Sequence, residues 1–328
     1  MSETKRITTP AAEEILDRYF PVLDHGFVAL VDYMGGDLAI EQAARVSYGG
    51  KAIRETKETR HLLRYMHRNG HTSPSEQVEL KFHCSMPIFV ARQWVRHRTA
   101  SLNEFSGRYS IMPMLFYTPP EDQLRPQSKT NKQGRDGAFV LDEKDEAFAR
   151  WESQRELATG NYQWFCDNDF ARELARIDLP LSTYTQWYWK IDLHNLLHFL
   201  SLRVDSHAQW EIQQFGKVMA GMLKRVAPLA YEAWIDYEVC GAGLSRMEMN
   251  ALRARLQKLD DQLCCVSPNP LVKSLLVKSY ELSEREADEF LQQFTLSFTP
   301  DFELDLSLAK DAAFFEAQAV AAVKSPGK

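Results

Sequence analysis

The sequence lacks the motifs that mark the common nucleotide-binding and hydrolase folds. Its 328 residues contain no GxGxxG opening a strand–helix unit, no GxxxxGK[ST] and no GxSxG. The first two absences argue against a Rossmann dinucleotide site and a P-loop, because both place phosphates on glycine-rich backbone at a helix N-terminus. The third argues against the nucleophile elbow of the α/β-hydrolases. A nucleotide bound by this chain would therefore be held by side chains in another kind of site.

Long apolar runs, paired cysteines and net positive charge are also missing. No run approaches the roughly 20 apolar residues that span a bilayer, and the first twenty residues lack the apolar centre of a signal peptide. Five cysteines without CxxC spacing, including Cys264 and Cys265, indicate reduced thiols. A formal net charge of −6 argues against a general polyanion binder, since nucleic-acid affinity depends on many cation–phosphate contacts. We therefore expect a cytoplasmic protein that binds neither nucleic acid nor membranes.

Strand patterns lie in the first third of the chain, and helical patterns dominate the rest. Residues 27–33 suit a buried strand, and period-two alternation over 78–85 predicts a strand with one wet face. Helices are predicted over 37–48, 55–68, 142–176, about 183–203 and 208–226. This order indicates an α+β fold with long helices, not a doubly wound sheet, in a chain of one large domain or two.

Capping residues mark the start of three predicted helices. Asp37 can cap the first helix of the chain. Ser245 with Glu248, and Ser283 with Glu286, have the spacing of capping boxes before apolar runs. The sequence therefore predicts two more helices toward the C-terminus.

A basic stretch at 96–109, "RHRTASLNEFSGRY", follows a helix that is predicted to begin at Pro87. Gln93, Arg96 and His97 are spaced to share one polar face at the end of that helix. Guanidiniums bind phosphate or carboxylate in a bidentate fashion, and neighbouring cations repel each other unless an anion lies among them. The stretch is therefore a candidate anion site.

Two explanations of the basic stretch stay open at this point. A ligand phosphate would neutralise the cations, and Gly107 would let the backbone approach it closely. Alternatively, the stretch is a surface cluster in which Ser101 and Glu104 form a capping box, although no amphipathic helix follows Glu104.

The segment 192–214 contains a possible metal pair. His194 and His198 have the i, i+4 spacing of helical metal ligands, and Asp205 and His207 are near enough in sequence to complete a site. The glutamate of an HExxH motif is missing, however. We expect no metal here, because two histidines on a helix are more often packed or hydrogen-bonded.

Arg203, in the same segment, follows an apolar stripe. A guanidinium near such a stripe needs an anionic partner, since burying it alone is costly. That partner is either Asp205 or Glu211 within the chain, or a ligand. Arg176, at the end of a helix, is a weaker candidate of the same type.

The basic stretch resembles a family signature. Arg96-His97-Arg98, seven residues and Ser106 reproduce the RHR-x7-S signature of the flavin-dependent thymidylate synthases, and "NEFSGRYS" extends the match. The segments "GFVALVDYMGGD", "AARVSYG", "PIFVARQWVRHR", "LPLSTYTQWYW" and "LRVDSHAQWEIQQF" resemble that family in the same order. The resemblance implies an N-terminal extension at 1–25, a synthase domain at 26–240 and a helical extension at 241–328. Residues 118–137, with a single aliphatic side chain, are predicted to be an exposed loop insertion.

The resemblance also implies an activity. Members of the family bind FAD, take a methylene group from 5,10-methylenetetrahydrofolate, use NADPH as reductant and convert dUMP to dTMP. They have their own α+β fold rather than a Rossmann fold, and they form homotetramers whose active sites lie between subunits. The anions that meet the basic stretch would then be the phosphates of dUMP and FAD.

Residue roles are carried over position by position. The resemblance assigns activation of the uracil ring to Arg203, by electrostatic stabilisation of the negative charge that develops there. Ser106 binds substrate in this scheme, and the cysteines lie outside the matched positions. The implied dUMP-binding residues are Gln93, Trp94, Val95, Arg96, Glu104, Phe105, Ser106, Gly107, Arg108, Arg176 and Arg203. The implied FAD-binding residues are Ser73, Arg96, His97, Arg98, Glu104, Asp192, Leu193, His194 and His198.

The match has departures, and two other hypotheses stay open. The family commonly has Thr at Ser73, a bulky apolar residue at Ser75 and His at Gln77. A metal-dependent hydrolase would use the histidines of 192–214. A nucleic-acid-binding module would use the basic and aromatic side chains of "RQWVRHR".

Overall fold

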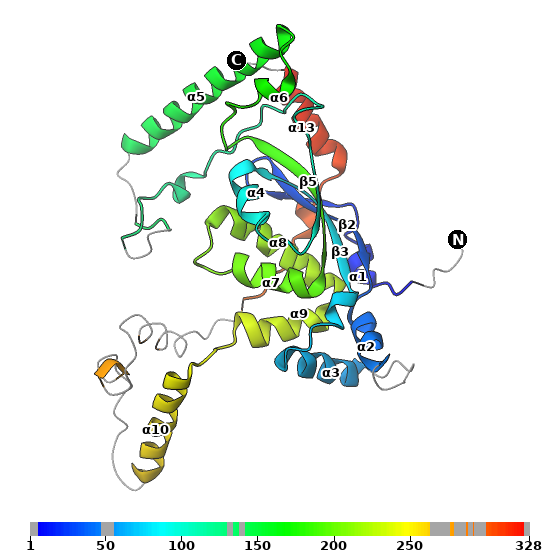
Figure 1. Ribbon diagram of the computed structural model, residues 1–328, viewed down its shortest axis with the longest axis vertical. Helices are drawn as coiled ribbons and strands as arrows, with labels where there is room; N and C mark the ends of the chain where they lie inside the picture. The colour runs from blue at the N-terminus through cyan, green and yellow to red at the C-terminus, as the bar shows by residue number, and fades with distance from the viewer. Residues whose placement is uncertain are drawn as a thin grey trace. The chain divides into compact units, whose positions relative to one another are not determined.

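An antiparallel five-stranded sheet forms the centre of the fold (Figure 1). The computed structural model describes residues 6–46, 56–129, 134–137, 142–262, 276–278, 287, 291 and 300–324. The strands are β1 (Tyr19–Val22), β2 (Gly26–Met34), β3 (Glu79–Pro87), β4 (Ser101–Glu104) and β5 (Tyr184–Asp192), and their order in the sheet is β1-β2-β3-β5-β4. The last strand in sequence, β5, therefore lies between the earlier strands β3 and β4 in the sheet.

The helix predicted over about 183–203 is wrong in its first half, which is strand β5. Trp187, Trp189 and Ile191 are buried and alternate with the more exposed Tyr188 and Lys190. This is period-two burial, and aromatic residues fit the pleated surface of a sheet. The predicted order of strands first and helices afterwards is corrected accordingly, while the α+β class is confirmed.

Two compact units make up the chain. The larger comprises Met1–Trp234 and Phe302–Lys328, and the smaller comprises Ile235–Asp301. Residues of the predicted 241–328 extension thus belong to both units. The larger unit contains α1 (Pro10–Glu13), α2 (Asp37–Val46), α3 (Thr56–Arg68), α4 (Ile88–Trp94), α5 (Asp142–Asp167), α6 (Arg172–Ala175), α7 (Leu193–Arg203), α8 (Trp210–Val226), α9 (Pro228–Trp234) and α13 (Ala312–Lys324).

An aromatic core joins α4, α7 and α8 to one face of the sheet. The Trp94 ring lies 5.3 Å from Trp189, 5.0 Å from Phe199 and 5.8 Å from Phe215, centroid to centroid. All four side chains are almost completely buried. Removing an aromatic side chain from such a core costs about 3–5 kcal/mol, so the C-terminal end of α4 is held firmly against the sheet.

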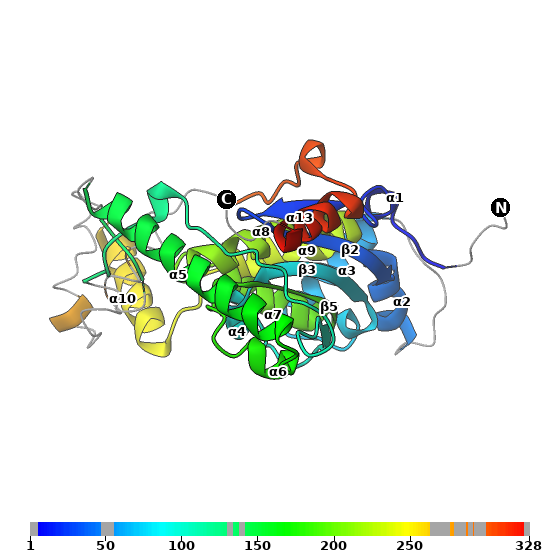
Figure 2. The same cartoon turned by 90° about the horizontal axis from the view of Figure 1, so that it is seen from above.

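Helix α13 crosses the opposite face of the sheet (Figure 2). Its Phe315 ring packs 4.7 Å from Phe27 and 6.0 Å from Tyr19. The predicted wet face of β3 is therefore only partly wet, because His83 is half-buried and Ser85 is 9% exposed beneath this layer. A segment far along the chain covers strands near its beginning, a contact that strand periodicity does not encode.

Asp37 caps a different helix from the one predicted. The N–H groups of Ala39 and Ile40 bond to the carbonyl of Gly36, and the Asp37 carboxylate instead accepts from the N–H groups of Leu229 and Ala230 at 2.8 and 3.0 Å. Asp37 therefore caps the start of α9. Burial raises the pKa of its carboxyl to about 6, although these two hydrogen bonds act in the opposite direction.

In the smaller unit the first predicted capping box is confirmed. The Ser245 N–H bonds to Glu248 Oε2 at 2.6 Å, and the Glu248 N–H bonds to Ser245 Oγ at 3.3 Å, at the start of α10 (Arg246–Gln262). The Ser283–Glu286 pair lies outside the described residues.

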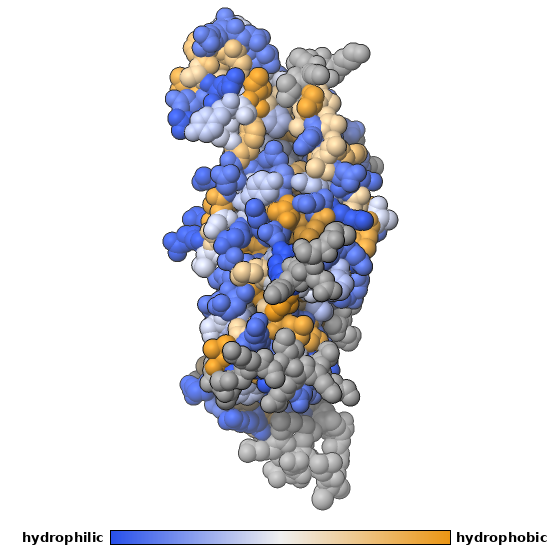
Figure 3. Space-filling model, turned by 90° about the vertical axis from the view of Figure 1, so that its right-hand side faces the viewer, coloured by the Kyte–Doolittle hydropathy of each residue, from blue (hydrophilic) through white to orange (hydrophobic). Residues whose placement is uncertain are grey.

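The surface shown in Figure 3 is mostly hydrophilic, with apolar residues in small groups. None of the described helices combines the length and the hydropathy that a membrane crossing requires.

Candidate functional site

The basic stretch begins in a turn that follows a short helix. α4 ends at Trp94, and the N–H groups of Arg96 and His97 bond back to the carbonyls of Gln93 and Trp94 at 3.4 and 3.0 Å. Arg96 and His97 therefore lie beyond the helix, and the predicted helical face shared with Gln93 is wrong. The completely buried Trp94 fixes this end, so the charged residues that follow are held near the surface.

Residues 101–104 form the edge strand β4, which pairs with β5. All four of its residues are exposed. The alternative in which Ser101 and Glu104 cap a helix is therefore excluded, since a strand occupies the position. The Glu104 carboxylate instead accepts a hydrogen bond from Thr185 Oγ1 at 2.7 Å, which ties it to the neighbouring strand.

Side chains from the α4 turn and from α7 line a common cavity of about 320 Å³. They include Arg96, His97, Arg98, His198 and Arg203. The His97 ring packs edge-on against Phe199 and lies 5.9 Å from the His198 ring. The structure thus brings the RHR triplet beside two of the residues that the resemblance selects in the 192–214 segment.

Arg203 is half-buried and bonds to His97. Its Nε donates to His97 Nε2 at 3.1 Å. Burial first, and then the positive charge of Arg203 and the proximity of His198, lower the pKa of His97 to about 4. His97 is therefore neutral near pH 7 and acts as the acceptor, so it adds no charge to the cluster.

The pairing of Arg203 with Asp205 or Glu211, one of the two alternatives left open by the sequence, is not present among the described residues. Asp205 bonds to His207 at 2.8 Å, and Glu211 bonds to Arg135 at 2.7 Å. Within the described ranges, Arg96, Arg98 and Arg203 have no acidic partner. Cations gathered without a counter-charge favour an anionic ligand in the cavity.

A second group of predicted residues assembles beside α6. A Cβ on Gly107 would lie 2.6 Å from Met112 Sδ and 3.1 Å from Arg176 Cδ, so the Arg176 side chain passes directly over this glycine. Arg108 Nε bonds to Glu173 at 2.9 Å, and its N–H bonds to Ser106 Oγ at 3.3 Å. This group is not among the residues that line the 320 Å³ cavity.

The remaining predicted residues differ in what they can offer a ligand. Asp192 caps α7 by accepting from the Asn195 N–H at 2.9 Å. Trp94 and Leu193 are completely buried, so neither residue exposes atoms to a ligand in a single chain. Val95 and Ser73 are exposed, and Phe105 and His194 are half-buried. No three His, Cys, Asp or Glu side chains in the described part of the chain lie close enough together to hold a metal ion.

A chain of hydrogen bonds that no sequence pattern indicates begins at Gln93. Gln93 donates to Gln209, and Gln209 donates to Glu211 Oε2 at 2.8 Å. The other oxygen of Glu211 accepts from Arg135 at 2.7 Å and from the Tyr117 hydroxyl at 3.0 Å. Glu211 is 2% exposed. Its role in this network depends on that burial, which the sequence does not reveal; from the sequence it was a candidate only as a partner for Arg203.

An antiparallel α+β unit in which Arg96, Arg98 and Arg203 line an open cavity, with no acidic partner among the described residues, has the features of a protein that binds anionic ligands. Comparison with known proteins identifies the family. Residues 29–229 match the family described as thymidylate synthase complementing protein. The chain belongs to this family, that of the flavin-dependent thymidylate synthases.

Relatives and solved structures agree with this assignment. The chain is 48% identical to a flavin-dependent thymidylate synthase of Wolbachia pipientis over 250 residues, 76% of this chain and 88% of the relative. It is 50% identical to one of Treponema denticola over 249 residues, 76% and 93% of the two chains. A crystal structure of the UMP/dUMP methylase PolB from Streptomyces cacaoi bound with 5-Br dUMP is similar with a TM-score of 0.61 and 34% identity, covering 66% of this chain and 97% of that one.

Proposed function

We propose that this chain converts dUMP to dTMP by reductive methylation, with 5,10-methylenetetrahydrofolate as carbon donor, NADPH as reductant and FAD as cofactor. The observation that carries the proposal is the cavity in which the RHR triplet meets Arg203 and no acidic side chain. Membership of the family supports the reaction, and the names of the relative and of the solved structure support the flavin cofactor and the uridylate substrate.

The donor set of the cavity fits part of a flavin dinucleotide. Arg96 and Arg98 offer two planar guanidiniums, which suit a pyrophosphate, and neutral His97 can meet an uncharged ring edge. Bound FAD would supply hydride-transfer chemistry. At about 320 Å³ the cavity is at the lower end of the roughly 300–1,000 Å³ common for small-molecule sites, so one copy holds only part of a dinucleotide.

Arg203 is the residue that we propose activates the uracil. Carbon 5 of uracil is a poor nucleophile, and charge must accumulate on the ring as it attacks the methylene group. Because Arg203 Nε is held by His97 at 3.1 Å, the guanidinium is oriented before substrate arrives and its other nitrogens remain for the ring. A preorganised donor of this kind is worth about 2.7–4 kcal/mol at the transition state in other enzymes.

The arrangement supports a homotetramer with active sites between subunits. The ligand-facing Arg96, Arg98 and His198 are all exposed in one copy, and Val95 and Leu202 beside them are each 48% exposed. The Gly107–Arg176 group and the Arg203 cavity are built separately in one chain. A second copy that brings one group to the other would complete the site and cover the apolar side chains.

Domain limits and location belong to the same proposal. The synthase domain spans 26–240, which the family match over 29–229 supports, with 118–137 as a loop insertion and 1–25 and 241–328 as extensions. Free thiols at Cys84, Cys166 and Cys240 support a cytoplasmic location.

Two arginine substitutions test the roles. Arg203→Ala should lower dTMP formation by at least about 100-fold while FAD stays bound, because the lost donor acts on the ring. Arg98→Ala should weaken flavin retention. Tritium release from labelled dUMP measures turnover, and absorbance in the flavin bands measures cofactor content. Arg150→Ala is the control, since Arg150 is 76% exposed on α5 and pairs only with Glu146 among the described residues. Wild-type turnover in Arg203→Ala would refute the role of Arg203.

A further inference from the structure

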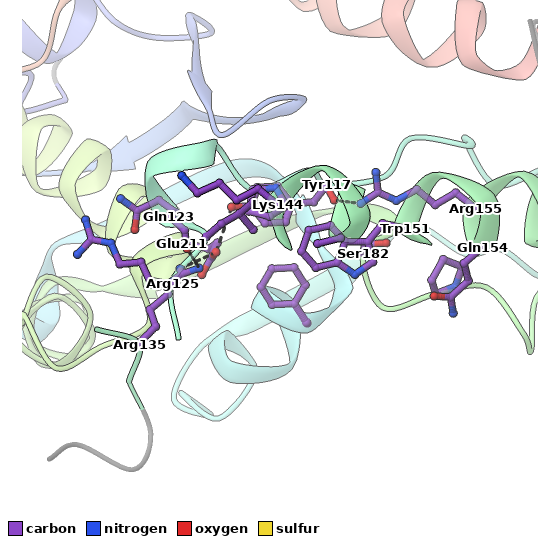
Figure 4. Close-up of a pocket in the computed structure, with 15 residues that line it drawn as sticks. Tyr117, Gln123, Arg125, Arg135, Lys144, Trp151, Gln154, Arg155, Ser182 and Glu211 are labelled. Atoms are coloured by element: carbon purple, nitrogen blue, oxygen red, sulfur yellow. Dashed lines mark hydrogen bonds and ion pairs between the residues drawn. The ribbon is translucent and has the colours of Figure 1, made fainter. Parts of the chain in front are cut away.

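A buried carboxylate, that of Glu211, lies in the wall of a second cavity of about 620 Å³ (Figure 4). Arg135 and Tyr117, in the same wall, donate to its Oε1 at 2.7 and 3.0 Å. Arg135 also donates to the Gln123 carbonyl at 3.2 Å, so the 118–137 loop is tied to the first turn of α8. Replacing a buried ion pair by apolar side chains is often neutral or stabilising, so packing alone does not require a charge at this position.

Glu211 is linked to the proposed dUMP site by Gln209, the residue that precedes α8. Its Oε2 accepts from Gln209 Nε2 at 2.8 Å, and Gln209 Oε1 accepts from Gln93 Nε2. Gln93 lies one turn before Arg96, whose N–H bonds to the Gln93 carbonyl at 3.4 Å. Among the described residues, Gln93 Oε1 and the second N–H of its amide have no partner. Both groups are therefore available to a ligand.

The charge on Glu211 fixes the direction of every hydrogen bond in this chain. A guanidinium can only donate, and an ionised carboxylate can only accept. Gln209 must therefore turn its NH₂ group toward Glu211 and its carbonyl oxygen toward Gln93. Gln93 must in turn direct its own NH₂ group toward Gln209. An uncharged amide at position 211 would impose no such direction, because it can donate as well as accept.

We propose that Glu211 is a positioning residue for dUMP, which acts through Gln209 to hold the Gln93 side chain in one orientation before the nucleotide binds. Ordering a long side chain in advance removes an entropic cost from binding. Because Arg203 and not Gln93 acts on the uracil ring, the benefit lies in the affinity for dUMP and not in the chemical step. This role rests on the proposed function, which makes Gln93 a dUMP-binding residue.

Two substitutions break the chain at different points. Glu211→Gln removes the charge with little change in shape. Gln209→Leu removes the link but leaves the Arg135–Glu211 pair in place, and Gln209 is exposed, so the core is not disturbed. Each should raise the KM for dUMP by about five-fold, because one long side chain must then be ordered on binding. Each should leave kcat unchanged, since binding weakens equally before and at the transition state.

Tritium release from labelled dUMP, at several dUMP concentrations, measures KM and kcat in the full-length protein loaded with FAD. Absorbance in the flavin bands shows whether each variant retains its cofactor and its fold. Gln214→Leu is the matched control on the same helix. Among the described residues the Gln214 amide donates only to the Trp210 carbonyl at 3.1 Å, so this variant should keep the wild-type KM.

The double variant Glu211→Gln/Gln209→Leu separates positioning from a purely structural role. If Glu211 acts through Gln209, the double variant has the same KM as Gln209→Leu alone. An unchanged KM in either single variant, a fall in kcat without a rise in KM, or a double variant whose KM rises by the product of the two single effects would overturn the proposal. Conversion of dUMP by the wild type would still leave the proposed function standing after any of these results. A wild type that neither releases tritium nor changes its flavin spectrum with dUMP would remove both.

Discussion

The Glu211 network gives a sharp prediction, because its two charged members are buried to different degrees. The Glu211 side chain is 3% exposed and that of Arg135 is 28% exposed. Removing the arginine leaves a carboxylate that water cannot reach, whereas removing the carboxylate leaves a guanidinium that can turn toward solvent. We therefore expect Arg135→Met to be more destabilising than Glu211→Gln.

The size of each effect follows from the remaining partners. Breaking a buried ion pair from one side costs about 3–5 kcal/mol. In Arg135→Met, Glu211 keeps the Tyr117 hydroxyl and the Gln209 amide, so we expect the lower end, about 3 kcal/mol. Burial and then the Glu211 charge raise the pKa of Tyr117 well above its usual value, so its hydroxyl remains a donor. In Glu211→Gln the loss is one charge-assisted hydrogen bond, about 1.5 kcal/mol.

Urea unfolding at fixed protein and FAD concentrations measures these free energies. The double variant Arg135→Met/Glu211→Gln should be more stable than Arg135→Met alone, because a neutral amide replaces the uncompensated carboxylate. The resulting coupling energy should exceed about 1 kcal/mol. Two results would contradict this reasoning: equal losses of unfolding free energy in the two single variants, or a loss in the double variant equal to the sum of the two single losses. Either would show that the buried Glu211 carboxylate does not need the Arg135 charge.

Two further predictions concern Asp37 and Gly107. Because burial raises the pKa of Asp37 from 3.8 to about 6, the stability that its protonated form contributes is present in full below pH 3.8 and is lost as the pH rises through 6. The unfolding free energy of the wild type relative to Asp37→Asn should thus fall by up to about 3 kcal/mol between pH 4 and pH 7, and a pH-independent difference in urea unfolding would contradict this. Gly107→Ala should raise the KM for dUMP, because the new methyl group would lie 3.1 Å from Arg176 Cδ and displace the arginine; an unchanged KM in steady-state kinetics would separate Arg176 from substrate binding.

Features that depend on only a few neighbouring residues, in the site and elsewhere in the chain, could be predicted well from the sequence. The RHR-x7-S spacing located the cationic cluster, and the i, i+4 spacing of His194 and His198 placed both on one helix, α7. The Ser245–Glu248 capping box formed as expected, since both of its hydrogen bonds join residues three positions apart. Such features need only the backbone geometry of a single element.

Other parts of the site depend on contacts between distant segments. Arg203 and His97 are 106 positions apart, and Gln93 and Gln209 are 116 positions apart. The aromatic residues of β5 alternate with the period of a strand, but the segment that follows them directly is helical. Pairing with β3 and β4 is what gives β5 its extended conformation. The same holds for Asp37, whose partners on α9 follow it by 192 and 193 positions.

The sequence by itself therefore determined the family, the α+β class and the residues that carry charge into the site. Only the tertiary structure decided which of those charges have partners, which stay open to a ligand, and which histidine is kept neutral. The physical reason is that hydrogen bonds within one turn follow from residue spacing, whereas the burial and pairing of a charge depend on every element that packs around it.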